Sequence, residues 1–121
     1  MEYFQLSFEL DKEHYATNYY IGLVYQDWED YYRALHHYSQ AIKAWPQFTD
    51  AMNNMAICFE CLGDDPNASL EQLERALETN PTPQLQLLLY TNLARLHGKR
   101  KNFEQHEYYQ GKVFQLLGFN L

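Results

Sequence analysis

The feature of this sequence that most limits its fold is an internal repeat: the 121-residue chain matches itself when shifted by 34 or 35 positions. A shift of 34 places Gly22 and Tyr25 on Ala56 and Phe59, so a small residue precedes an aromatic one in both copies. A shift of 35 aligns the second half of the unit, and pairs Ala34, Tyr38, Ala41 and Pro46 with Ser69, Leu73, Ala76 and Pro81. Such periods are typical of arrays in which each unit buries its apolar surface only against its neighbours.

Residues that stop helices occur at four places along the chain: Pro46, 63–67, 80–83 and 98–102. The stretches between them have the length of helices. Between 31 and 45, apolar residues recur three and four positions apart, which is the spacing of an amphipathic helix. No segment sustains the alternation typical of a strand. The sequence therefore predicts an all-α fold, in which small residues such as Gly22 allow paired helices to approach closely.

Four motifs resemble the signature of the tetratricopeptide repeat (TPR) family: NYYIGLVY, YYRALHHYSQAIKAWP, NNMAICFECLGD and ASLEQLERALETNP. The resemblance implies a right-handed superhelix of antiparallel helix pairs, an α-solenoid. It assigns residues 15–48 to a first repeat, 49–83 to a second, and 84–121 to a degenerate third repeat or C-terminal cap. The third copy is weaker because His106 stands in a slot that the family fills with a small alanine, as does Val113.

The first residues resemble the end of a repeat, since EYFQLSFELDK is similar to the last turns of a second TPR helix. Residues 1–12 are therefore interpreted as a partial repeat that forms an N-terminal cap, with Asp11 marking the break before the next helix. Phe4 and Phe8 are expected to pack against that next helix, near Tyr20 and Val24. On this interpretation the chain either is a segment of a longer TPR protein or begins with a half-repeat cap.

The resemblance also implies where a partner would bind, because TPR proteins usually hold ligands on the concave face that the first helices of successive repeats form. The predicted partner-binding residues are Tyr19, Tyr20, Leu23, Asn53, Asn54, Ile57, Asn92, Arg95 and Lys99, flanked by Gln26, Glu60 and Thr91. Carboxamides such as Asn54 and Asn92 suit a peptide backbone because they both donate and accept hydrogen bonds. Arg95 and Lys99, four positions apart, suit a carboxylate. Some of these residues could instead simply solvate the inner helices.

We expect a protein–protein interaction module that takes a partner's peptide or helix in this groove, and no enzyme, metal or cofactor. One family role is excluded by the residues themselves. TPR domains that hold the C-terminal tails of chaperones use a clamp of lysines, asparagines and an arginine, and only Asn54 matches it. Leu23 and Leu88 stand in clamp positions and cannot bind a carboxylate, so binding of such tails is not expected.

The composition limits the other partners. The formal net charge of -7 argues against a nucleic-acid surface, which needs a basic patch, and against an anionic membrane surface. No apolar run is long enough to span a bilayer, and no signal peptide is visible. A cytoplasmic protein with reduced cysteines is the expectation.

Two alternatives remain open. The C-terminal segment VFQLLGFNL carries more apolar residues than a solvated last helix needs, which fits an oligomerising segment of a larger scaffold. Cys58 and Cys61 form a CxxC motif, but they lie late in a predicted helix, whereas a redox pair needs a helix N-terminus. A zinc site would need two further ligands, and His97 is the only candidate helper. The five histidines are otherwise expected to be solvated surface residues.

Overall fold

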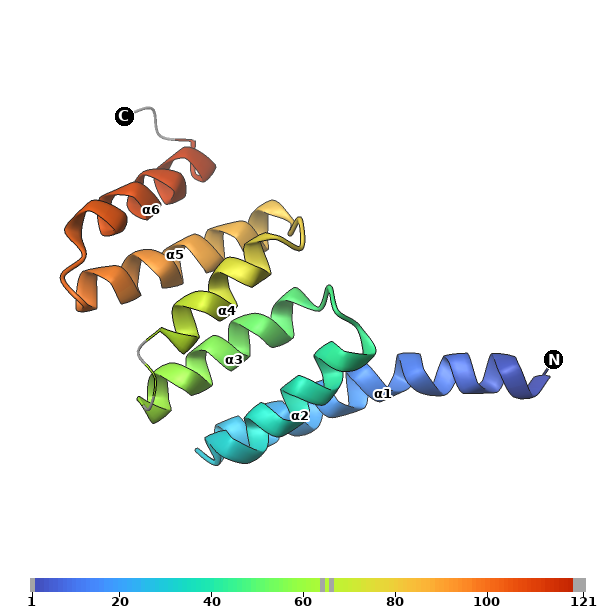
Figure 1. Cartoon of the computed structure of the whole chain (residues 1–121). Helices are drawn as coiled ribbons and strands as arrows, with labels where there is room; N and C mark the ends of the chain where they lie inside the picture. The colour runs from blue at the N-terminus through green and yellow to red at the C-terminus, as the bar shows by residue number, and fades with distance from the viewer. Residues whose placement is uncertain (1, 64, 66, 119–121) are drawn as a thin grey trace.

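The structure is a computed structural model that describes residues 2–63, 65 and 67–118, with side chains described from His14 onward. These residues form six α-helices: α1 (Glu2–Asp27), α2 (Tyr31–Ala44), α3 (Thr49–Leu62), α4 (Ala68–Leu77), α5 (Pro83–Lys99) and α6 (Phe103–Leu116) (Figure 1). The all-α prediction is confirmed, and α2 to α5 each end at one of the four predicted breaks.

Local sequence explains the helix ends. The Asp30 carboxylate accepts a hydrogen bond from the Arg33 backbone N–H at 3.3 Å and caps α2, which ends just before Pro46. The Thr82 hydroxyl accepts from the Leu85 N–H at 3.4 Å, and Pro83 takes the first position of α5, where its missing N–H costs nothing.

In the part of the chain that the structure describes, the turn inside each helix pair has a residue in the left-handed conformation. These residues are Glu29, Gly63 and Lys101, with φ of 63°, 69° and 63°. They are separated by 34 and 38 positions, and the first interval equals the shift of 34 at which the sequence matches itself. Only Gly63 adopts this conformation without steric cost. The backbone therefore repeats its turn geometry even where the turn residue differs.

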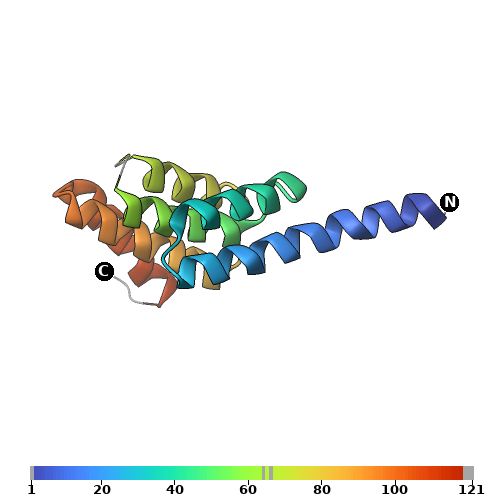
Figure 2. The ribbon, with the colours of Figure 1, turned by 90° about the horizontal axis from the view of Figure 1, so that it is seen from below.

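The helices pack mainly as neighbours in sequence (Figure 1). The antiparallel pairs α1–α2, α3–α4 and α5–α6 make the most extensive contacts, while α2 on α3 and α4 on α5 join one pair to the next. A further, smaller contact joins α3 to α5. Figure 2 shows α1 continuing beyond the other helices towards the N-terminus.

The expected break at Asp11 is wrong, because α1 is one continuous helix from Glu2 to Asp27. The physical reason is local: Lys12 stands where the family has its stop proline, and the residues around it are ones that a helix tolerates. The assignment of residues 1–12 to a partial repeat stays a prediction, as do the other repeat boundaries. The expected contacts of Phe4 and Phe8 lie outside the described side chains.

The slots that repeat in the sequence form the buried core. Ala34, Tyr38 and Ala41 of α2 are 0% exposed and pack with residues of α3 such as Met55 and Cys58. In the second pair the equivalent residues Ser69, Leu73 and Ala76 are 3%, 0% and 0% exposed, and the two apolar ones share a core with Leu89, Leu93 and Leu96 of α5. Small residues at these slots let the helices approach, and the larger one fills the space between them.

The third pair departs from this arrangement. None of the described residues of α6 is fully buried, and its apolar residues Phe103, Tyr108 and Leu116 are exposed. The large His106 is accommodated because Gly98 faces it from α5, where an added Cβ would stand 2.9 Å from His106 Nδ1. A glycine on one helix thus offsets the missing alanine on the other.

Candidate functional site

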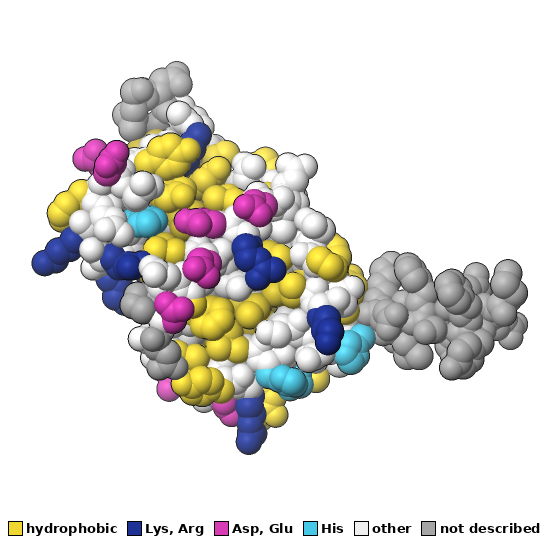
Figure 3. Space-filling view, in the orientation of Figure 1, with side chains coloured by type: hydrophobic (Ala, Val, Ile, Leu, Met, Phe, Trp, Pro, Cys, Tyr) yellow, Lys and Arg dark blue, Asp and Glu magenta, His cyan; other side chains and the backbone are white. Residues whose placement is uncertain are grey.

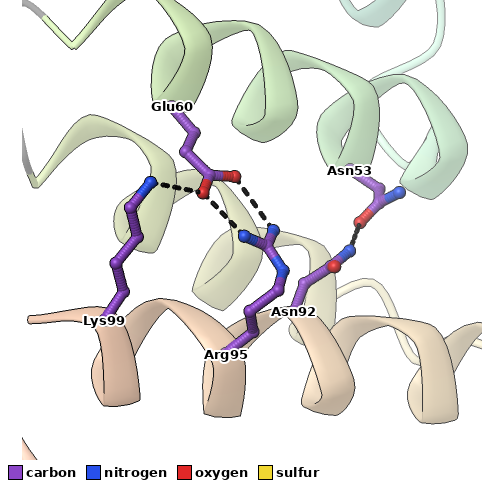
Figure 4. A network of polar contacts seen from close by, with 5 residues as sticks. All are labelled: Asn53, Glu60, Asn92, Arg95 and Lys99. Carbon is purple, nitrogen blue, oxygen red and sulfur yellow. Dashed lines mark hydrogen bonds and ion pairs between the residues drawn. The ribbon is translucent and has the colours of Figure 1, made fainter.

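The candidate site is the set of polar side chains that α1, α3 and α5 bring together. Three contacts connect these helices in order: Asn54 with Tyr19, Asn92 with Asn53, and Arg95 with Glu60. The two partners lie 35, 39 and 35 positions apart, so each contact joins one helix pair to the next. Figure 4 shows the two contacts between α3 and α5.

At the α1 end, Tyr19 is a structural as well as a polar residue. Its ring packs against Phe48 with centroids 4.8 Å apart, and its hydroxyl accepts a hydrogen bond from the Asn54 carboxamide at 3.1 Å. The second hydrogen of the same carboxamide goes to the Asp50 carbonyl oxygen at 3.0 Å. Burial, followed by the charge of Asp50, raises the pKa of Tyr19, so the hydroxyl stays protonated and able to donate.

In the middle of the site the two asparagines bind each other. Asn92 donates to the Asn53 carboxamide oxygen at 2.9 Å, and Asn53 is 5% exposed. A buried carboxamide needs such a partner, because an unsatisfied one costs about 1–3 kcal/mol. Asn53 is therefore a spacer between α3 and α5, whereas Asn92 is half-buried and keeps access to solvent.

At the α5 end, Arg95 and Lys99 meet a carboxylate, as their spacing suggested, but it is the internal one of Glu60. Arg95 binds it with both guanidinium nitrogens, at 2.6 and 2.9 Å, and Lys99 Nζ lies 3.4 Å away (Figure 4). The hydrogen bond and charge of Arg95, aided by Lys99, lower the pKa of Glu60 despite its burial. Two cations on one carboxylate leave this end with a net positive charge.

The apolar members of the predicted site differ in access. Leu23 and Ile57 are half-buried, and Leu23 packs on the core between α1, α2 and α3. Tyr20 is 65% exposed, with its ring edge-on to that of Tyr19 at 5.7 Å. Leu88 lies one helical turn before Asn92 and is 43% exposed. From the sequence alone, it was identified only as a clamp position that cannot bind a carboxylate. Exposure of a leucine beside a functional candidate was not predictable from its periodicity.

The face of the molecule on which α2 lies in front of α1 carries charges of both signs between apolar patches (Figure 3). Such a mixed surface lacks the single-sign field that steers nucleic acids or other highly charged ligands.

The two cysteines differ in access. Cys58 is buried, and burial, followed by the charge of Cys61, raises the pKa of its thiol to about 12. Cys61 is exposed. The nucleophile of a redox pair needs a lowered pKa, which the buried Cys58 does not have. Among the described residues, no three His, Cys, Asp or Glu side chains lie close enough to hold a metal ion.

The expectation of solvated histidines is wrong for three of the five. His97 is 7% exposed, and His37 and His106 are half-buried. His37 Nδ1 lies 2.9 Å from the Asn18 carboxamide oxygen, and its ring stacks on Tyr25. A histidine can be buried between helices when another ring stacks on it and a polar atom hydrogen-bonds to its nitrogen. These partners are distant in the sequence, so the burial could not be predicted from local sequence.

Comparisons with protein-family models and with curated proteins give no match. In the described part of the chain, no helix combines the length and apolar character that a membrane span requires.

Proposed function

We propose that this chain is a tetratricopeptide-like solenoid segment that binds an extended peptide or a helix of a partner protein on the face formed by α1, α3 and α5. The observation that carries the proposal is the series of contacts at intervals of 35 to 39 residues along these three helices. Because polar side chains of α3 contact both α1 and α5, side chains from the three helices form one continuous surface. The left-handed turn residues, which recur at 34 and 38, support the same repeat.

The surface offers different chemistry at its two ends. The α1 end supplies the exposed ring of Tyr20, and α5 supplies Leu88, so apolar side chains of a partner have anchors at both places. Asn92 and Thr91 provide polar groups between them for a peptide backbone. The net positive charge around Glu60 favours an acidic residue of the partner at the far end. Aromatic and apolar anchors usually dominate binding energy, and the polar groups fix register.

The test is affinity capture with variants that remove the exposed anchors and leave the core intact. Tyr20→Ala and Leu88→Asp change exposed side chains, so both should fold, as circular dichroism would check. The matched control is Tyr108→Ala, which removes a similarly exposed tyrosine from α6. We expect a protein captured by the wild type and by the control to be lost with both site variants. If both site variants keep every captured protein, or the wild type captures none, the proposal is wrong.

A second candidate function is self-association as part of a larger helical scaffold. It is supported by the exposed apolar residues Leu116 and Leu117 at the end of α6, where an array would place its next helix. Phe119 of the same predicted patch lies outside the described residues. Light scattering over a wide concentration range tests this function: a mass that stays at that of one chain would contradict it. Either function fits a cytosolic setting, in which both thiols stay reduced.

A further inference from the structure

The contact between α5 and α6 is built around a buried histidine. The His97 ring is 7% exposed and lies nearly parallel to the Tyr109 ring, with centroids 5.6 Å apart and planes at 12°. Tyr109 in turn stacks on Tyr90 of α5 at 6.0 Å. None of the described residues of α6 is fully buried, and Tyr109 is one of its half-buried residues that contact α5.

Hydrogen bonds distinguish the two histidines at this contact. The carboxamide nitrogen of Asn102, in the turn before α6, lies 3.2 Å from His97 Nδ1, so a neutral His97 accepts there from the amide. The Asn102 backbone N–H also donates to the His97 carbonyl oxygen at 2.8 Å. His106 Nδ1 lies 2.7 Å from the Ala94 carbonyl oxygen and must donate its proton to it. A second proton would therefore disturb His97 but would leave the bond of His106 intact.

Charged groups from the surrounding helices mostly oppose a proton on His97. Burial is the largest cause that lowers its pKa, followed by the charge of Arg100 at the end of α5, and His106 of α6 acts in the same direction. Glu74 of α4 acts against them and raises the pKa. From α3, Glu60 faces α5, but two cations of α5 already bind it. The buried ring is thus held neutral.

We propose that the α5–α6 contact is a pH-sensitive latch, in which protonation of His97 releases α6 from α5 and exposes the α5 surface around Tyr90 and His97. The Asn102 carboxamide could turn its oxygen towards a protonated ring. The charge would still be buried beside Tyr109 and close to His106, and release of α6 gives it water instead.

The direction follows from linkage. With α6 released, His97 is hydrated and regains the ordinary histidine pKa of 6.5, which is above its value in the docked state. The docked state is therefore favoured fully above pH 6.5 and loses that advantage as the pH falls towards the docked pKa. For each pH unit that the pH falls between the released and docked pKa values of His97, the ratio of released to docked α6 rises by about ten-fold.

The experiment follows the imidazole of His97 and the backbone amides by NMR in the same ¹⁵N-labelled sample, from about pH 8 to about pH 5, the range in which histidine titrates. We expect the heteronuclear NOE of the α6 amides to fall as the pH is lowered, with the same midpoint as the titration of the His97 imidazole. The NOE of the α3 and α4 amides should stay constant. His97→Phe, which can still stack on Tyr109 but cannot ionise, should abolish the transition. His36→Gln, at an exposed histidine of α2, should leave it unchanged.

If the heteronuclear NOE of the α6 amides stays constant while His97 titrates, the proposal is wrong. This outcome can be observed in the wild-type chain, without any variant. A pH-dependent fall in the NOE of the α6 amides that persists in His97→Phe would also overturn the proposal. So would a transition in which all helices lose order together, because that is global unfolding. His37 also has a pKa lowered by burial and, secondly, by the charge of His36. It lies between α1 and α2, so its titration is distinguished by the amides of those helices.

Discussion

The ring of Tyr38 lies directly against the backbone of Gly22: a Cβ added at Gly22 would stand 2.6 Å from Cε1 of the ring. The ring cannot simply swing away, because Tyr38 is 0% exposed and its hydroxyl donates to Gln26 Oε1. The spacing of α1 and α2 therefore depends on the absence of a side chain at residue 22.

The first prediction concerns Gly22→Ala, which should lower the free energy of unfolding by about 1–2 kcal/mol. Overpacking costs about 1–3 kcal/mol, and the higher helix propensity of alanine offsets up to about 1 kcal/mol of it. Urea denaturation followed by circular dichroism measures the change. Gly111→Ala in α6 is the control, since a Cβ there meets nothing within 4 Å and should stabilise the chain. Equal stabilisation by both changes would contradict the prediction.

The second prediction concerns the pairing of Gly98 with His106. Gly98→Ala should destabilise the chain because the new Cβ would stand 2.9 Å from His106 Nδ1. Combined with His106→Ala, which vacates that space, the same change should be neutral or stabilising. A double-mutant cycle measured by urea denaturation should give a coupling of about 0.5–3 kcal/mol. Strict additivity would show that the two residues do not constrain each other.

The third prediction concerns the left-handed turn residues. Glu29→Gly should raise the free energy of unfolding by up to about 1 kcal/mol, because glycine adopts the φ of 63° without steric cost. Gly63→Ala, at φ of 69°, should lower it. As a control, glycine at the exposed Glu71 inside α4 should cost about 1 kcal/mol through lost helix propensity. Destabilisation by Glu29→Gly as large as that of the control would refute the interpretation of the turn.

The fourth prediction concerns the thiols. At about pH 8, near the pKa of a free thiol, a disulfide reagent should label one cysteine of the folded chain quickly. That residue is Cys61, which is exposed, whereas burial raises the pKa of Cys58 to about 12. Both should react after unfolding in urea. Cys61→Ser should abolish the fast phase, and a fast phase that survives this change would contradict the assignment.

The fifth prediction concerns the ion pairs of Glu60. The pKa of this carboxyl is lowered in the folded chain, so its stabilising effect is present above the ordinary value of 4.5 and is lost as the pH falls through the folded value. Glu60→Gln should therefore lower stability by about 0.2–1 kcal/mol near neutral pH, a small effect because Arg95 is half exposed. The difference should shrink in acid. Glu71→Gln, an exposed change on α4, is the control and should change stability by no more than about 0.5 kcal/mol near neutral pH.

Local sequence was sufficient to predict the helices and most of their ends. Pro46, Gly63 and Pro83 act through their own backbone, so their effect does not depend on distant residues. The single failure, at Asp11, occurred where the expected stop was inferred from a resemblance and the stop residue itself was missing. The buried slots Tyr38 and Leu73 were also predictable, because periodicity places them on the inner face of their helices.

The sequence did not predict which polar residues of the candidate site pair with one another. The repeat identified Asn53, Asn92 and Arg95 as neighbours on one face, yet it did not indicate that they would bind Asn92, Asn53 and Glu60. Which polar groups are already satisfied depends on the separation and rotation of α3 and α5, and these follow from core packing over the whole contact.

The sequence by itself determined the all-α class, the helix pairs and the repeat period, because helix propensity, stop residues and apolar spacing act within a few residues of one another. Only the tertiary structure decided that Gly98 makes room for His106, that His97 is buried, and that Glu60 takes both cations of α5. Burial, hydrogen bonding and pKa are set by atoms from segments far apart in the chain. They exist only once the helices have packed.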